Sequence, residues 1–236
     1  MPPKIGFLTI GQSPRDDILP DITTILGSGL EIIEQGALDG LARKEIEGLR
    51  PGKNDFPLIT RLKDGSAVVV GKRKILPLLQ ARISSLERQK ADLIALLCTD
   101  DFPHIHARKL FLSPHRILLG TVRSIMNEGR LGVLAPLEEQ KDRLREKWQK
   151  TGLEIFIDNL NPYEESPASV RVIERMKRHR VDLIVLDCIG YSAQIKEKIN
   201  LATGRPVLLP RSLLARLINE LISLRMGQSY GLKTSY

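Results

Sequence analysis

Cysteine and aromatic residues are scarce in this sequence. Its 236 residues include two cysteines, Cys98 and Cys188, and aromatic residues make up 4% of the chain. The cysteines do not form the C-x-x-C pairs of a structural zinc site, and a reducing compartment disfavours a disulfide between them. We therefore expect no bound metal.

Motifs for nucleic-acid binding are also absent, although the net charge is +8 and the pI is 9.6. The basic clusters at 72–74 and 175–180 are interleaved with apolar residues and have few aromatic neighbours, as in solvated helix faces. We expect no nucleic-acid partner. A positive field is compatible with a small anionic substrate.

No apolar run reaches the roughly 20 residues that a membrane-spanning helix needs. Strand-like sequence starts at Lys4, which predicts no signal peptide and, by default, a cytoplasmic location. With 42% hydrophobic residues, the chain is long enough for one large domain or two compact lobes.

Both cysteines end similar segments. Residues 91–99 read ADLIALLCT and residues 181–189 read VDLIVLDCI, so the pattern Asp-Leu-Ile-x-Leu-x-Cys recurs 90 positions apart. Each segment is a nearly continuous apolar run, typical of a buried parallel strand, and ligands bind beyond the carboxyl ends of such strands. A single buried cysteine is more often a core residue. Here a cysteine recurs at the same position in two matching segments, which favours a functional role for both cysteines.

Strand and helix patterns alternate along the chain in two similar series. This predicts two α/β/α lobes with parallel sheets and a ligand cleft between the cysteine-bearing edges. An Asp-Gly turn at 64–65 predicts a hairpin that interrupts the first series. We assign residues 1–129 and 207–226 to the first lobe, residues 130–206 to the second, and residues 227–236 to a disordered tail.

The loop after the first strand, Gly11 to Asp17, has groups suited to an anion. Ser13 is a good N-cap and Pro14 a good first residue for a helix that ends at Leu26. Backbone N–H groups and the Arg15 guanidinium could hold a carboxylate or phosphate there. Simple capping, with Arg15 in solvent, is the alternative.

Five segments carry a resemblance to a known family: 8–11 (LTIG), 112–118 (LSPHRIL), 132–136 (GVLAP), 186–190 (LDCIG) and 206–209 (PVLL). On these residues the chain resembles the AroM family within the aspartate/glutamate/hydantoin racemase superfamily. The resemblance covers all but the tail and implies that superfamily's fold. It also implies that Cys98 and Cys188 are the two thiols that lie on opposite faces of a bound amino acid.

The activity that this resemblance implies is that of a cofactor-independent racemase or epimerase of a small carboxylate, with a homodimer possible. One thiolate removes a proton and the opposite thiol returns one. Both cysteines precede turns that can begin helices, and a helix N-terminus would lower the pKa of a thiol. The predicted substrate-binding residues are Gly11, Gln12, Ser13, Arg15, Thr99, Pro136, Ile189 and Gly190.

Two alternatives stay open. One is an isomerase or lyase that acts on a small diacid and uses one cysteine covalently. The other is a non-catalytic protein that binds a small ligand. The residues after the cysteines, Thr99-Asp100 and Ile189-Gly190, differ from the Asn-Thr and Thr-His that are common in the superfamily. That difference favours the binding protein somewhat.

Overall fold

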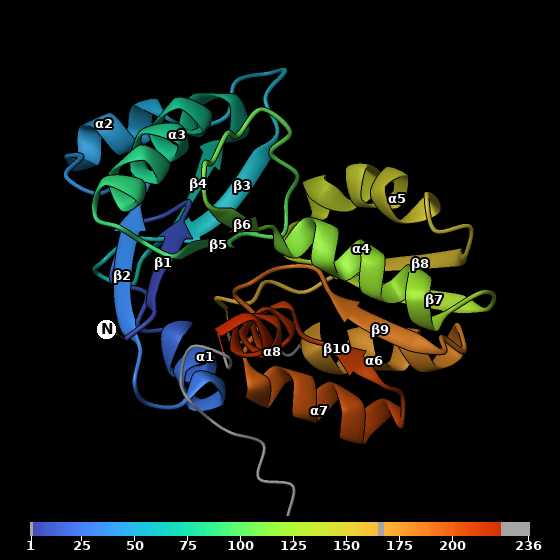
Figure 1. Cartoon of the computed structure of the whole chain (residues 1–236). Helices are drawn as coiled ribbons and strands as arrows, with labels where there is room; N and C mark the ends of the chain where they lie inside the picture. The colour runs from blue at the N-terminus through green and yellow to red at the C-terminus, as the bar shows by residue number, and fades with distance from the viewer. Residues whose placement is uncertain (1, 165–167, 223–236) are drawn as a thin grey trace, which may run out of the picture.

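The computed structural model describes residues 2–164 and 168–222; the tail predicted at 227–236 lies outside them. The chain forms two four-stranded parallel sheets with helices on their faces (Figure 1), which confirms the predicted fold class. In the first sheet the order is β2 (Glu31–Gly36), β1 (Lys4–Thr9), β5 (Leu93–Leu97) and β6 (Leu110–Leu112). In the second it is β10 (Val207–Leu208), β9 (Leu183–Leu186), β7 (Arg130–Ala135) and β8 (Glu154–Asn159).

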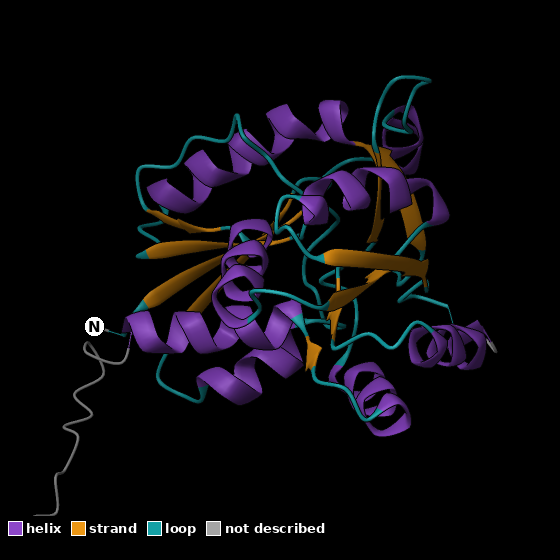
Figure 2. Ribbon diagram, turned by 90° about the vertical axis from the view of Figure 1, so that its right-hand side faces the viewer, coloured by secondary structure: helices purple, strands orange, loops and turns teal. Residues whose placement is uncertain are grey.

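Helices bury the strands of both lobes (Figure 2). Every residue of β5 and of β9 is buried, as the apolar repeat predicts. The first lobe contains α1 (Leu19–Leu26), α2 (Arg43–Gly48) and α3 (Lys72–Arg88). The second contains the 3-10 turn η1 (Glu138–Gln140), α5 (Lys141–Gln149), α6 (Ala168–Arg178) and α7 (Ala193–Thr203). None of the helices within the described ranges has the length and apolar character needed to cross a membrane.

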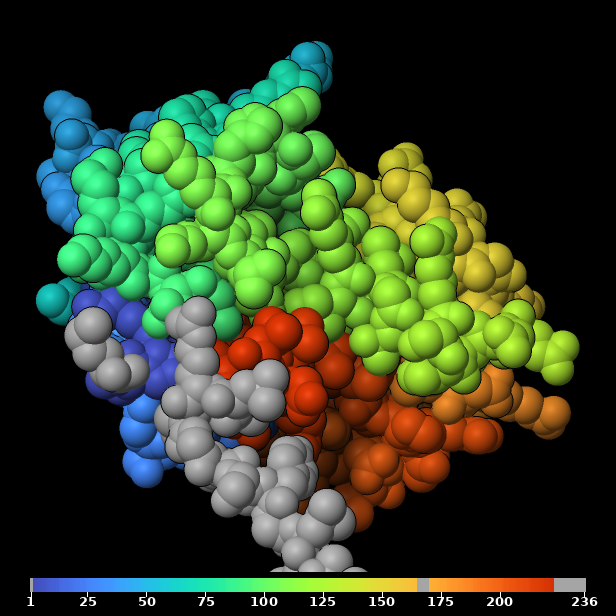
Figure 3. Space-filling model, in the orientation of Figure 1, coloured from blue at the N-terminus to red at the C-terminus, as the bar shows by residue number. Residues whose placement is uncertain are grey.

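Each lobe sends its last helix to the other lobe. Helix α4 (Pro114–Ile125) follows β6, yet Leu118 and Val122 lie in the core of the second lobe. Helix α8 (Pro210–Ile222) follows β10 and packs against α1 in the core of the first lobe. In the space-filling view α8, in red, fills part of the junction between the lobes (Figure 3). The lobes are therefore joined by reciprocal exchange of a helix.

Two elements lie differently from the predicted lobe boundaries. Residues 114–129 and 207–208 were assigned to the first lobe, whereas α4 packs on the second sheet and β10 pairs with β9. The apolar face of α4 packs into the core of the second lobe. The order of elements along the chain does not predict this contact. The division into domains itself stays a prediction.

The hairpin forms where the sequence predicts it, with β3 (Pro57–Arg61) antiparallel to β4 (Ala67–Gly71). Gly65 in its turn has φ +82°, a conformation that L side chains rarely adopt. The strand end that leads into this turn lies against the loop after β1, where the Gln12 N–H donates to the Arg61 carbonyl. A Cβ atom on Gly11 would lie 2.3 Å from the carbonyl oxygen of Arg61, so this loop requires glycine.

The predicted N-cap at Ser13 is wrong. Helix α1 begins at Leu19, and Ile18 is its N-cap residue. The N–H and hydroxyl groups of Ser13 donate instead to the Asp39 carboxylate, at 2.7 and 2.6 Å. Because Ser13 is held by the β2–α2 loop, the segment that follows it carries Arg15 into the interior rather than into solvent.

We predict that Gly11→Ala lowers the free energy of unfolding by about 1–3 kcal/mol, since a Cβ there forces the hairpin away from the loop. Urea unfolding measures the change. Gly48→Ala is the matched control, because its Cβ would meet nothing within 4 Å and alanine is the better helix former. Equal stability of wild type and Gly11→Ala would contradict the close approach.

Candidate active site

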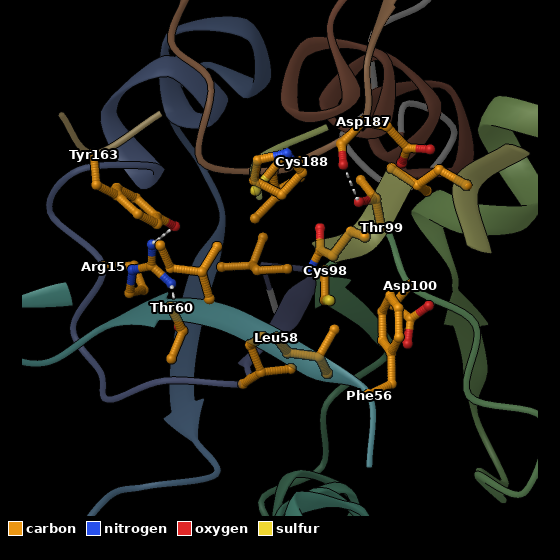
Figure 4. Close-up of a pocket in the computed structure, with 17 residues that line it drawn as sticks. Arg15, Phe56, Leu58, Thr60, Cys98, Thr99, Asp100, Tyr163, Asp187 and Cys188 are labelled. Atoms are coloured by element: carbon orange, nitrogen blue, oxygen red, sulfur yellow. Dashed lines mark hydrogen bonds between the residues drawn. The ribbon is translucent and has the colours of Figure 1, made fainter. Parts of the chain in front are cut away.

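The two thiols of the repeat line one cavity between the lobes (Figure 4). Cys98 directly follows β5, and Cys188 follows β9 after one residue. Both strands lie inside their sheets, and their carboxyl ends meet at this junction. The volume of the cavity is about 30 Å³, enough for about two water molecules.

Of the predicted substrate-binding residues, four line this cavity: Arg15, Thr99, Pro136 and Ile189. Three others bond elsewhere through their backbone N–H groups: Gly11 to the Thr9 hydroxyl, Gln12 to the Arg61 carbonyl and Ser13 to Asp39. Gly190 contributes indirectly, because its N–H donates to Cys188 Sγ at 3.4 Å. For these four, direct contact with a substrate stays a prediction.

A buried ion pair lies beside the thiols. Lys147 Nζ donates to both carboxylate oxygens of Asp187 at 2.9 and 2.8 Å, and Trp148 Nε1 donates to one of them at 2.7 Å. Lys147 is 7% exposed and Asp187 is 2% exposed. The cost of burying the Asp187 charge is offset because its carboxylate accepts hydrogen bonds from both the ammonium and the indole.

This ion pair also connects the two cysteine-bearing strand ends. Lys147 Nζ donates to the carbonyl oxygen of Thr99 at 3.1 Å, and the Thr99 hydroxyl donates to the carbonyl oxygen of Asp187 at 3.0 Å. Thr99 follows Cys98, and Asp187 precedes Cys188. Hydrogen bonds from one lysine and one threonine therefore fix the position of one thiol relative to the other.

Arg15 occupies one end of the cavity and is 2% exposed. Its Nε and Nη2 donate to the Asp17 carboxylate at 2.7 and 2.8 Å. Nη1 donates to the hydroxyls of Thr9 and Thr60 at 2.8 and 3.5 Å, and Nη2 donates to the Tyr163 hydroxyl at 3.2 Å. These bonds use all five N–H groups of the guanidinium. Burial favours its neutral form, but the bonds and charge of Asp17 hold the pKa of Arg15 above its ordinary value.

Burial raises the pKa of both thiols, so the expected lowering by helix N-termini is wrong. The pKa of Cys188 rises to about 11; the Gly190 N–H and the Arg15 charge oppose the effect of burial. The pKa of Cys98 rises further, because the charge of Asp100 adds to the effect of burial. The next helices, α7 and α4, begin only at Ala193 and Pro114, too far along the chain to stabilise either thiolate.

The hairpin and the second lobe close over the cavity. Gln140 Nε2 donates to the carbonyl oxygen of Pro57 at 2.8 Å. The Arg143 guanidinium lies 4.4 Å from the centre of the Phe56 ring. A cavity for two water molecules is too small for an amino acid, so we expect this cover to move when a substrate enters.

The sequence analysis missed several residues of this site, among them Thr60, Gln140, Lys147 and Tyr163. Lys147 could have been found, because it shares the buried face of α5 with Leu144 and Trp148, at the i, i+3, i+4 spacing of a core stripe. Tyr163 lies in the loop after β8, where no periodic pattern points to it.

The fold is similar to those of solved structures of two racemases and a decarboxylase. An allantoin racemase from Klebsiella pneumoniae is 16% identical, with 94% of this chain and 89% of that chain covered and a TM-score of 0.61. A Picrophilus torridus aspartate racemase is 13% identical, with 94% of each chain covered and a TM-score of 0.60. An arylmalonate decarboxylase is 14% identical, with 92% of each chain covered and a TM-score of 0.58. The chain thus has the fold of the aspartate/glutamate/hydantoin racemase superfamily.

The sequence itself identifies the family. Residues 5–222 match the family described as AroM protein, and the chain belongs to it. The predicted family is therefore confirmed. No curated protein sequence matches the chain.

We predict that the alkylation rate of Cys188 by iodoacetamide rises about tenfold per pH unit up to about pH 11, and that Cys188 reacts before Cys98. A raised pKa leaves less thiolate at neutral pH, and the two thiols are equally exposed, at 8% and 7%. Mass mapping of the labelled peptides measures both rates. A plateau near pH 8, or faster labelling of Cys98, would refute this order.

A second prediction concerns the ion pair. Lys147→Met should lower the free energy of unfolding by about 3–5 kcal/mol, because it leaves a buried carboxylate without its cation. The exposed pair of Lys177 with Glu174 provides the control, and Lys177→Met should change stability by less than about 1 kcal/mol. Urea unfolding of both variants measures the change. Similar losses of unfolding free energy would show that the buried ion pair of Lys147 stabilises the fold no more than the exposed pair of Lys177.

Proposed function

We propose that this protein is a cofactor-independent racemase or epimerase that acts on a small carboxylate by proton transfer between Cys98 and Cys188. One observation carries the proposal: the two thiols end matching strands of the two lobes and line the same cavity. The racemase neighbours named for allantoin and aspartate support it through their shared fold. The cytoplasmic location and the homodimer stay predictions.

Inversion requires one base, one acid and a site for negative charge. The Cys188 thiolate removes the proton from the carbon next to the carboxylate, and the electron pair of that C–H bond moves onto the carboxylate as an enolate. The Cys98 thiol then donates its proton to the opposite face of the carbon. The products are the inverted substrate, a Cys188 thiol and a Cys98 thiolate, so the reverse reaction starts from Cys98.

The unequal thiols favour a second candidate, a lyase or isomerase in which one cysteine reacts. Cys188 receives the Gly190 N–H and the field of Arg15, whereas Cys98 faces the charge of Asp100. Cys188 would then be the reacting residue. The arylmalonate decarboxylase among the structural neighbours, which has the same fold, supports this candidate.

The test is deuterium incorporation at the α-carbon of amino and hydroxy acids in heavy water, for each enantiomer separately. We predict that Cys188→Ala lowers exchange from one enantiomer by at least about 100-fold and Cys98→Ala lowers exchange from the other, while neither variant racemises. Circular dichroism of both variants controls for folding.

Other outcomes reject the proposal. Exchange that depends on Cys188 alone, in both enantiomers, would identify the one-cysteine enzyme. No exchange across the panel, together with thiols that resist alkylation, would identify a protein that only binds a ligand.

A further inference from the structure

The two ends of the cavity differ in chemistry, and the thiols lie between them. Figure 4 shows Arg15 and Tyr163 on one side and Phe56 and Asp100 on the other. A substrate whose reacting carbon lies between the thiols must place one substituent toward each end. The character of each end therefore limits what the substrate can be.

Two hydroxyl groups at the Arg15 end still have a proton to donate. The oxygens of Tyr163 and Thr60 accept hydrogen bonds from the guanidinium, and their own protons have no acceptor among residues 2–164 and 168–222. Burial raises the pKa of Tyr163, so its hydroxyl stays protonated at neutral pH. Thr99 differs from them, because its proton is already donated to Asp187.

The charges at this end favour an anion. Arg15 is paired with Asp17, and the Arg61 guanidinium lies 5.0 Å from the centre of the Tyr163 ring. The Nε of Arg61 is buried and has no acceptor within the described part of the chain. The carboxylate of Glu34 also accepts the backbone N–H of Arg15, at 2.7 Å, so two cations and two carboxylates lie near this end. Of these four groups Arg15 alone lines the cavity, and its charge favours the negatively charged form of Cys188.

The opposite end disfavours a second carboxylate. Asp100 lies there, paired with Lys72 at 2.7 Å and 3.9 Å from Arg143 Nε. At Cys98 the charge of Asp100 outweighs that of Lys72 and raises the pKa of the thiol. Among the 17 described residues that line the cavity, Arg15 is the one cation. Phe56 and Leu144 supply an apolar surface instead.

We propose that the hydroxyls of Tyr163 and Thr60, oriented by Arg15, bind the single carboxylate of the substrate, and that the Phe56 end accepts an apolar group. Arg15 is a positioning residue, because its N–H groups are already bonded within the protein. The substrate class is a monocarboxylate with an aryl or alkyl substituent, not a diacid such as aspartate or glutamate. The inference rests on the carboxylate chemistry of the proposed function.

Calorimetry on the wild-type protein tests the ligand class directly. Phenylacetate, phenylacetamide and succinate serve as probes, and we expect phenylacetate to bind at least about tenfold more tightly than either of the others. Succinate that binds as tightly as phenylacetate overturns the inference, and so does the absence of heat from phenylacetate.

Two variants test the two ends. Tyr163→Phe should weaken phenylacetate binding about 10- to 100-fold, with a smaller loss for phenylacetamide, because a hydrogen bond to a charged group is lost. Asp100→Asn should improve succinate binding relative to phenylacetate, because Lys72 is then uncompensated. Equal losses for the acid and the amide, or an unchanged succinate ratio, contradict the assignment of that end.

Tyr191→Phe is the matched control for loss of a tyrosine hydroxyl. The Tyr191 hydroxyl donates to the backbone carbonyls of Ala135 and Leu160, away from the cavity lining. We expect it to lower stability in urea and to leave phenylacetate binding unchanged. An equal loss of binding in Tyr191→Phe would show that Tyr163→Phe reports only a structural effect.

Binding needs no turnover, so the two proposals can fail separately. The expected binding pattern without deuterium exchange would reject proton transfer and keep the ligand class. Exchange at the α-carbon of diacids in preference to aryl acids would support proton transfer and reject the ligand class.

Discussion

The position of the two thiols depends on the buried pair of Lys147 and Asp187. Burying two charges costs several kcal/mol per ion, and only a fully hydrogen-bonded arrangement offsets that cost. Here the indole of Trp148 and the carbonyl of Thr99 complete the arrangement. The same bonds join the end of β5 to the end of β9. An interaction within the core is therefore also what fixes the geometry of the candidate active site.

Much of the fold could be predicted from the sequence, because local patterns determine it. The apolar repeat that ends at Cys98 and Cys188 predicted two buried strands, and the Asp-Gly turn at 64–65 predicted the hairpin. Contacts between distant segments were not predictable in this way. The burial of Arg15 depends on Asp17, Tyr163 and two threonines from separate elements, and no spacing in the sequence encodes their convergence. The raised pKa of each thiol follows from burial, which is a tertiary property.

Because the pKa of each thiol is raised, the site must stabilise a thiolate before either cysteine can act as a base. With a pKa of about 11, forming the Cys188 thiolate at pH 7 costs about 5 kcal/mol. A bound carboxylate would increase that cost through repulsion. Arg15, whose charge opposes the rise in the pKa of Cys188, lies at the end of the cavity where we place the carboxylate and offsets part of this repulsion. In the proposed reaction, the cation that positions the hydroxyls for the carboxylate would thus also favour the thiolate.

The reciprocal exchange of helices limits how the molecule can move. The chain passes between the lobes just before Pro114 and again just before Pro210, and the helices that these prolines begin contact each other. Proline restricts φ at each crossing. One residue lies between β6 and α4, and one lies between β10 and α8, so neither connection has slack that would let the lobes separate there.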